Sequence, residues 1–154
     1  KVEQGPTAII DYAHRPDALE NVLSTINSIK KHQSKLYTVV GCGGDRDATK
    51  RPVMAAIASR LSDQIILTSD NPRNENPEAI LEDMKKGLDD HQKNKALSVL
   101  DRREAIKLAL KLADVKDIVL LAGKGHEKYQ EIKGVRHDFD DYQIASEFLN
   151  QINN

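Results

Sequence analysis

The sequence has 154 residues, of which 39% are hydrophobic and 31% charged, and its formal net charge is -1. These values are typical of a single globular domain with one core, and the lack of a basic excess argues against nucleic-acid binding. Neither a membrane span nor a signal peptide is predicted, because no apolar run approaches the roughly 18 to 20 residues required and the N-terminus lacks a basic-then-apolar pattern.

Short apolar strands alternate along the chain with amphipathic helices. Strands are predicted at residues 8–10, 36–40, 64–68, 96–100 and 117–122, and helices at residues 16–31, 52–61, 77–88, 102–112 and 142–149. Residues 129–132 and 135–139 flank Lys133-Gly134, which indicates a tight hairpin. This order predicts an α/β fold with a doubly wound, mostly parallel, Rossmann-like sheet, helices on both faces and a C-terminal hairpin.

Two helix starts carry capping signals. Asn76 precedes Pro77, and Asp101 stands three residues before Glu104. The whole chain, residues 1–154, is expected to be one domain, because it shows no linker, repeat or low-complexity segment. Residues 1–7 lead almost directly into a strand, without a leader, which suggests a domain cut from a longer protein. Cys42 is the only cysteine, so an internal disulfide is excluded and the reducing cytoplasm is favoured.

Polar residues cluster after four of the predicted strands. They are Asp11 and His14, residues 41–46, residues 70–73, and residues 123–127. In a doubly wound sheet these strand ends emerge at one edge, where such folds bind their ligands. We therefore expect residues far apart in the sequence to form one site there.

The tetrapeptide Asp70-Asn71-Pro72-Arg73 follows the buried strand 64–68. Pro72 has no N–H and favours an extended backbone at Asn71, so the polar side chains are presented in a nearly fixed order. An arginine held in this way suits a carboxylate or a phosphate. The alternative is a solvated turn whose Asp and Asn cap the next helix.

Neither glycine-rich segment forms a complete nucleotide motif. In residues 41–46 the third glycine of a dinucleotide fingerprint is misplaced and Arg46 stands where a pyrophosphate would approach. Gly123-Lys124-Gly125-His126 lacks the spacing and the Ser or Thr of a P-loop. If the domain uses ATP, most of the phosphate machinery must lie elsewhere.

The remaining polar residues allow more than one interpretation. His14 and His126 lack a paired ligand at helical spacing, so no metal site is predicted, and a hydrogen-bonded or nucleotide-contacting role is favoured. Glu127 suits a general base, a binder of amino groups or a surface position. Lys50 and Arg51 suit either a phosphate across a domain interface or a solvated helix start.

Five segments together resemble the C-terminal domain of the Mur ligases, in the branch that adds meso-diaminopimelate. They are residues 11–19, 41–47, 50–52, 70–73 and 123–127. The resemblance implies an ATP-dependent, ADP-forming ligase of peptidoglycan synthesis that acts on UDP-N-acetylmuramoyl-L-alanyl-D-glutamate through an acyl phosphate. In that family a central domain holds the P-loop, the magnesium sites and a carbamylated lysine, and an N-terminal domain holds the UDP end. ATP and magnesium are thus the implied cofactors, magnesium being held mainly outside this chain, which alone is expected to be inactive.

The resemblance also implies residue roles. The positions that match contacts to meso-diaminopimelate are Arg46, Asp70, Asn71, Pro72, Arg73, Gly123 and Glu127. Asp11 matches a contact to the ATP ribose, with His14 close by, while Arg15 replaces the small polar residue of many relatives. The chemistry agrees, because an amino acid with two zwitterionic ends needs cations for its carboxylates and acceptors for an ammonium.

Three alternatives remain open. The first is the equivalent domain of a related ligase with another amino acid, although a lysine-adding enzyme gains nothing from Arg73 at the distal end of its substrate. The second is a nucleotide-binding regulatory or dehydrogenase domain of Rossmann type, which the incomplete fingerprint at Gly41 disfavours. The third is an interaction module, which leaves the polar strand ends unexplained.

Overall fold

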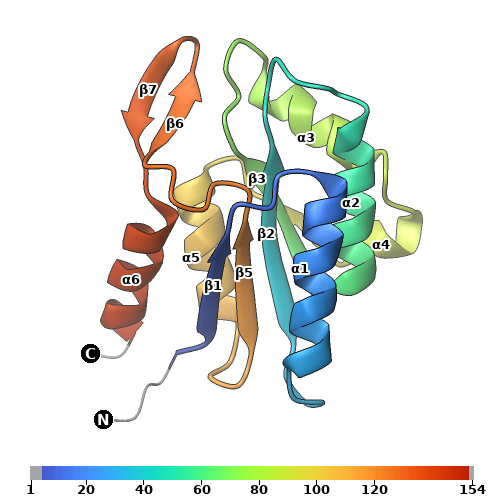
Figure 1. Ribbon diagram of the computed structural model, residues 1–154, viewed down its shortest axis with the longest axis vertical. Coiled ribbons are helices and arrows are strands. Elements are labelled where there is room, and N and C mark those ends of the chain that lie inside the picture. The colour runs from blue at the N-terminus through green and yellow to red at the C-terminus, as the bar shows by residue number, and fades with distance from the viewer. Residues whose placement is uncertain (1–4, 153–154) are drawn as a thin grey trace.

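The computed structural model describes residues 5–152, so both ends of the predicted 1–154 domain lie outside the described part. Its main sheet contains β1 (Thr7–Asp11), β2 (Leu36–Cys42), β3 (Gln64–Ser69), β4 (Ala96–Ser98) and β5 (Ile118–Ala122). The spatial order is β1-β5-β2-β3-β4, and every pairing is parallel (Figure 1). The carboxyl ends of these strands therefore meet at one edge of the sheet.

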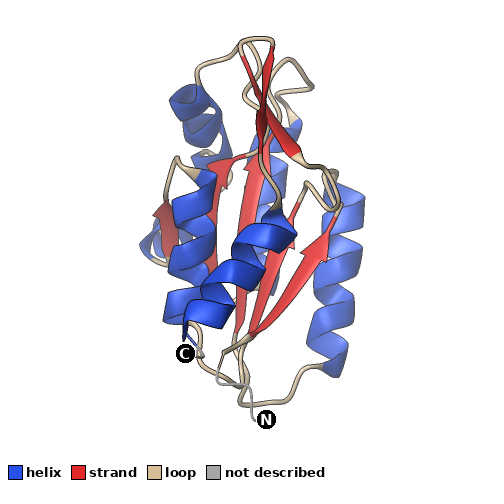
Figure 2. Ribbon diagram, turned by 90° about the vertical axis from the view of Figure 1, so that its left-hand side faces the viewer, coloured by secondary structure: helices blue, strands red, loops and turns tan. Residues whose placement is uncertain are grey.

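Helices cover both faces of this sheet, as Figures 1 and 2 show. One face packs against α1 (Pro16–Ile29), α2 (Lys50–Leu61) and α3 (Pro77–Lys85), and the other against α5 (Arg102–Leu112) and α6 (Asp141–Ile152). Each face of the sheet has its own hydrophobic core, and successive residues of β2 point into opposite cores because side chains alternate along a strand. Val39 packs with α5 and α6, and Val40 packs with α1 to α3. The predicted α/β fold is confirmed.

The helix predicted over residues 77–88 is wrong at its end. The chain leaves α3 at Lys85 and forms a separate short helix, α4 (Asp90–Asn94). None of the residues in α4 is buried, so no apolar period announces it, and a capping box between Asp89 and Gln92 starts it instead. The other predicted elements are present with boundaries that differ by a few residues.

Both predicted helix caps are confirmed. The Asn76 side chain accepts a hydrogen bond from the backbone N–H of Glu78, and Asp101 accepts one from that of Glu104. Within the described range, no helix combines the length and the apolar character needed to cross a membrane.

The predicted C-terminal hairpin consists of β6 (Tyr129–Ile132) and β7 (Val135–Asp138), paired antiparallel. Its turn residues Lys133 and Gly134 have φ values of 50° and 78°, the left-handed conformations that a two-residue hairpin turn favours. The hairpin stands at the carboxyl edge of the main sheet, beside the loops that follow β2 and β3 (Figure 1). An isolated parallel bridge between Ile132 and Arg73 joins it to the loop after β3.

Candidate functional site

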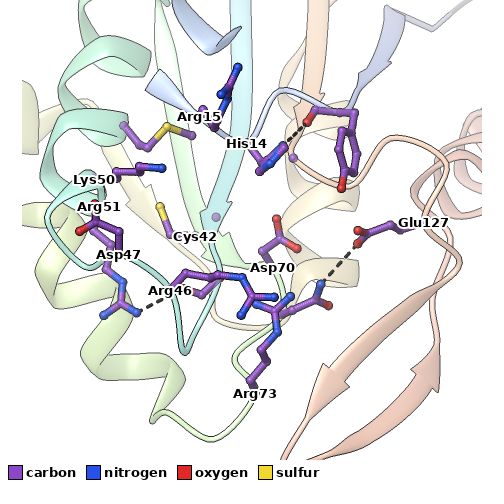
Figure 3. A pocket seen from close by; sticks show the side chains of 16 residues that line it. His14, Arg15, Cys42, Arg46, Asp47, Lys50, Arg51, Asp70, Arg73 and Glu127 are labelled. Carbon is purple, nitrogen blue, oxygen red and sulfur yellow. Dashed lines mark hydrogen bonds between the residues drawn. The ribbon is translucent and has the colours of Figure 1, made fainter. Parts of the chain in front are cut away.

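A cleft of about 510 Å³ lies at the carboxyl edge of the sheet, between the loops that follow β1, β2, β3 and β5 (Figure 3). The predicted site residues that line it are His14, Arg46, Asp70, Asn71, Arg73, Gly123 and Glu127. Pro72 does not line the cleft, and Asp11 lines a neighbouring shallow hollow that shares His14 with it. The expected convergence of separate strand ends is therefore present in the structure.

The loop after β3 is buried rather than solvated. Asp70 and Asn71 expose only 7% and 4% of their surface. The Asn71 carbonyl Oδ1 accepts hydrogen bonds from Lys124 Nζ at 2.9 Å and from the Glu131 N–H at 2.9 Å, while its Nδ2 donates to Glu127 Oε1 at 3.3 Å. Since Asn76 caps α3, the interpretation of this loop as a solvated turn that caps the next helix is wrong.

Arg73 takes an unusual backbone conformation that β6 holds in place. Its φ is 52°, in the left-handed region that non-glycine residues seldom adopt. The Arg73 N–H donates to the Glu131 carbonyl at 2.9 Å, and the Lys133 N–H donates to the Arg73 carbonyl at 2.7 Å. The hairpin thus compensates for a conformation that costs on the order of 1 kcal/mol in an L-residue.

The glycine-rich turn after β2 packs against this loop. The Gly44 N–H donates to the Asn71 carbonyl at 2.8 Å, and a Cβ atom at Gly44 would overlap the Pro72 carbonyl oxygen. The close approach of the loops after β2 and β3 therefore explains why residue 44 is a glycine, and a bound dinucleotide is not needed to explain it. Gly123 has a φ of 113°, and a Cβ there would lie 2.7 Å from Asp70 Oδ2, so glycine is also required beside the Asp70 carboxylate.

Charges of both signs face the cleft. In Figure 3 Arg73 lies in the lower part of the view with Arg46 above it, while Asp70 lies near the centre and Glu127 to the right. The Arg73 guanidinium donates from Nη1 to the Gly44 carbonyl at 3.0 Å, and its Nε lies 3.6 Å from Glu131 Oε1. The arrangement can receive a carboxylate and an ammonium at neighbouring positions.

Lys124 is a site residue that the sequence interpretation missed. Its side chain is fully buried behind the cleft, with Nζ 3.3 Å from Asp70 Oδ1 and 3.5 Å from Glu127 Oε1. The signal was its place between Gly123 and Gly125 directly after a buried strand, but a lysine among glycines favours a phosphate loop rather than a buried ion pair.

Arg102 is a second missed residue, and it fixes the ends of two strands. It forms a fully buried, two-pronged ion pair with Asp141 of α6, with contacts of 2.9 and 2.7 Å. It also donates to the carbonyl of Ser69 at the end of β3 and to that of Ala122 at the end of β5, both at 3.1 Å. Burial opposes its charge, yet the Asp141 carboxylate raises the pKa of Arg102 above its ordinary value. The strands that carry the two site loops are thereby held together.

The interpretation of Arg51 as part of a solvated helix start is wrong. Arg51 is buried, donating to Glu75 at 2.7 Å, to Asp83 at 3.0 Å and to the Gly43 carbonyl at 3.2 Å. Hydrogen bonds from Arg51 lower the pKa of both Glu75 and Asp83. Arg51 thus supports the glycine-rich turn through the Gly43 carbonyl. Lys50, in contrast, is exposed where it lines the cleft.

The loop after β1 forms the other end of the cleft. The Asp11 carboxylate accepts a hydrogen bond from the Ala13 N–H at 2.9 Å, and His14 Nδ1 lies 3.0 Å from the Tyr12 carbonyl oxygen. The Tyr12 and His14 rings are tilted against each other with centroids 4.7 Å apart, and Tyr12 is half-exposed. These groups present an aromatic surface beside a carboxylate.

Cys42 lines the cleft, but burial and then the Asp70 carboxylate raise the pKa of its thiol to about 12. It therefore stays protonated and unreactive at neutral pH. In residues 5–152 no cluster of three or more His, Cys, Asp or Glu side chains is placed to hold a metal ion.

The fold and this edge-of-sheet cleft define an α/β domain that binds its ligand at the carboxyl ends of parallel strands. The sequence model described as "Mur ligase, glutamate ligase domain" matches residues 1–125, and the chain belongs to that family. The predicted resemblance to the Mur ligases is therefore confirmed.

Two curated relatives and one solved structure carry the same specific name. The chain is 62% identical over 146 residues to UDP-N-acetylmuramoyl-L-alanyl-D-glutamate--2,6-diaminopimelate ligase of Cytophaga hutchinsonii, and 56% identical over 146 residues to that of Bacteroides fragilis. Each match covers 95% of this chain and 30% of the relative. A solved structure of a ligase of that name superposes with a TM-score of 0.89 at 44% identity, covering 100% of this chain and 32% of that one. The chain thus spans about a third of the proteins it matches.

Proposed function

We propose that this chain is the amino-acid-binding and ATP-closing C-terminal domain of an ADP-forming ligase that adds meso-diaminopimelate to UDP-N-acetylmuramoyl-L-alanyl-D-glutamate in peptidoglycan synthesis. The names of the similar ligases support the substrate, and membership in the Mur ligase family supports the reaction class. The observation that carries the proposal is the presence of both signs of charge on the loop after β3, where Arg73 and the buried Asp70 line one corner of the cleft.

The proposed substrate suits this corner. Each end of meso-diaminopimelate bears a carboxylate and an ammonium, so a selective pocket must bind both signs at the end that does not react. We assign Arg73 and the Asn71 amide to the distal carboxylate, with Arg46 as a second cation, and Asp70 and Glu127 to the distal ammonium. Gly123 leaves the room that Asp70 needs, and Pro72 fixes the loop without touching the ligand.

The chain's part in the reaction is to hold and orient the nucleophile. ATP supplies the phosphoryl group that converts the carboxylate of the muramoyl dipeptide into an acyl phosphate. The amine at the free end of diaminopimelate then attacks the acyl carbon, an amide bond forms, phosphate leaves and the nitrogen loses a proton. Fixing the distal end by several contacts presents this amine in one orientation, which is the main contribution that positioning residues make to such a step.

The nucleotide edge is assigned to the loop after β1. We place the ATP ribose at Asp11, whose carboxylate keeps acceptor capacity beyond its bond to the Ala13 N–H, with His14 nearby. Magnesium would be held mainly by a central domain outside this chain. ATP is a cytoplasmic substrate, so we expect the ligase to act in the cytoplasm.

The test is amino-acid specificity in the ligase that contains this chain. Phosphate release is measured with ATP, magnesium and the UDP-linked dipeptide, with meso-diaminopimelate, L-lysine or no amino acid added. We expect release that depends on diaminopimelate, with lysine used poorly. Preference for lysine or another amino acid would identify the chain as the equivalent domain of a different Mur-type ligase and refute the proposed substrate.

A further inference from the structure

We propose that Lys124, together with β6 behind it, is a positioning residue that makes the pocket selective for a zwitterionic amino-acid end. The inference rests on the proposed function, which assigns ligand contacts to Asp70, Asn71 and Glu127 but none to Lys124. Lys124 is fully buried, so it acts on a ligand only through the residues it touches.

The ammonium of Lys124 contacts four polar groups of this corner. Nζ donates to Asn71 Oδ1 at 2.9 Å and to the Tyr129 carbonyl at 2.8 Å, and it lies 3.3 Å from Asp70 and 3.5 Å from Glu127. The lysine therefore joins the loop after β3, the loop after β5 and the first residue of β6. A buried group with this many partners orients them and has little freedom of its own.

The first consequence is the orientation of the Asn71 amide. Lys124 Nζ and the Glu131 N–H are both donors, and both lie on the side of Asn71 Oδ1. The amide must therefore turn its NH₂ group toward Glu127 and the cleft, because only an oxygen can accept these two hydrogen bonds. A donor is thereby fixed where a ligand carboxylate would bind.

The second consequence concerns charge. Asp70 and Glu127 carry two formal negative charges beside the single positive charge of Lys124, and Arg102 is already paired with Asp141. Asp70, Glu127 and Lys124 together thus carry one net negative charge, which one ligand ammonium neutralises. Without Lys124 the two carboxylates would lose the cation that lies close to both, and a single ligand ammonium would leave one of their charges uncompensated.

The third element is the hairpin, which holds the loop from the other side. Gln130 Nε2 donates to the Asp70 carbonyl at 2.7 Å, and the backbone of Glu131 bonds to both Asn71 and Arg73. These contacts come from β6, beyond the residues 1–125 that match the family model. Amino-acid selection in this chain therefore depends on a segment outside the matched family region.

The experiment uses Lys124→Met, Lys124→Arg and Gln130→Ala in the ligase that contains this chain, with exposed Lys128→Met as the matched control. KM and kcat are measured for diaminopimelate, for its analogue 2-aminopimelate, which lacks the distal amino group, and for ATP. For Lys124→Met we expect KM for diaminopimelate to rise by about 30-fold or more, as for truncation of a buried charge partner. KM for ATP should not change in these variants. The control Lys128→Met should leave all of the measured constants unchanged.

Selectivity provides the readout that a purely structural role would not move. Because the two carboxylates then face the ligand without the Lys124 cation, the preference for diaminopimelate over 2-aminopimelate should grow in Lys124→Met and return toward the wild-type value in Lys124→Arg, which restores the charge with a different shape. Gln130→Ala removes one neutral hydrogen bond and should raise KM for diaminopimelate by about fivefold. Gln130→Ala also tests the proposal if the Lys124 variants do not fold. Gln130 is only half-buried, so its replacement should leave the fold intact.

The inference is overturned if Lys124→Met leaves KM for diaminopimelate and the analogue ratio unchanged, or lowers activity equally for all substrates. If the Lys124 variants do not fold, an unchanged KM in Gln130→Ala overturns it. Failure of the proposed function is seen separately, in the wild-type ligase. If that enzyme uses another amino acid, the same variants compared with that substrate still test the role of Lys124.

Discussion

Replacing Arg73 by Ala tests the proposed recognition of the distal carboxylate separately from the other roles of the loop after β3. The Arg73 side chain is 17% exposed, and its contacts to Gly44 and Glu131 use Nη1 and Nε. Among the described residues none pairs with Nη2, so donors remain for a ligand. Arginine and alanine both carry a Cβ, so the left-handed φ of 52° costs nearly the same in either, and the comparison isolates the guanidinium.

The size of the effect follows from burial. Truncating one partner of a buried, hydrogen-bonded charge pair costs on the order of 2 to 5 kcal/mol. Because Arg73 keeps some exposure and Glu131 offsets part of its charge, we expect the lower part of that range, about 2 to 3 kcal/mol, or about 30- to 150-fold in kcat/KM for diaminopimelate. Arg73→Lys keeps the charge without the planar fork and should recover only part of the loss.

The assay compares diaminopimelate with L-lysine in the ligase that contains this chain. Lysine has no distal carboxylate, so its already low kcat/KM should change far less. The ratio of kcat/KM for diaminopimelate to that for lysine should therefore collapse. Arg60→Ala is the control, because Arg60 lies on α2 with 55% of its side chain exposed and only a 3.6 Å contact to Glu20. Equal losses for both amino acids would show that Arg73 supports the fold or the shared end, and would refute the selectivity reasoning.

Four further predictions test the remaining assignments. Asp11→Ala should raise KM for ATP and leave KM for diaminopimelate nearly unchanged, and the opposite pattern would move Asp11 to the amino-acid pocket. The isolated chain should release no phosphate above background with all three substrates, because it carries no complete P-loop; turnover by the chain alone would contradict this. Arg102→Leu leaves Asp141 buried without a partner and should lower the free energy of unfolding in urea by about 3 to 5 kcal/mol, whereas the double variant with Asp141→Leu should lose less. The Cys42 pKa of about 12, against an ordinary 9.0, means that the unfolded state loses its thiol proton first, so stability should fall as pH rises from 9.0 toward 12 and native Cys42 should resist alkylation at pH 8.

The fold was predictable because its signals are local and periodic. Alternating strands and amphipathic helices identified the sheet and its two layers, and the caps at Asn76 and Asp101 marked helix starts by side-chain chemistry alone. The parallel arrangement then brought the polar strand ends to one edge. The short helix α4 was not predicted, because it is polar, has no apolar face and starts from a capping box.

The parts of the site that were missed are buried charged residues whose partners lie far away in the sequence. Arg102 and Asp141 are 39 residues apart in sequence, and Lys124 and Asn71 are 53 apart. A charged residue on a helix or in a glycine-rich loop is usually exposed, so no local pattern distinguishes these buried residues from surface ones. Arg51 was misjudged for the same reason, since its partners Glu75 and Asp83 come from a later loop and from α3.

These buried pairs explain how a shared sheet can carry a specific pocket. The strand ends that bear the site loops belong to the region that matches the family model, residues 1–125. Several of the groups that fix those loops come from beyond it: Asp141 holds Arg102 between β3 and β5, and β6 holds Asn71 and Arg73 by backbone hydrogen bonds. Because backbone groups make the contacts from Glu131, changes in the hairpin's outer side chains should be tolerated. Changes in its length or register would shift the whole loop after β3, since one residue of slip reverses which groups face Asn71.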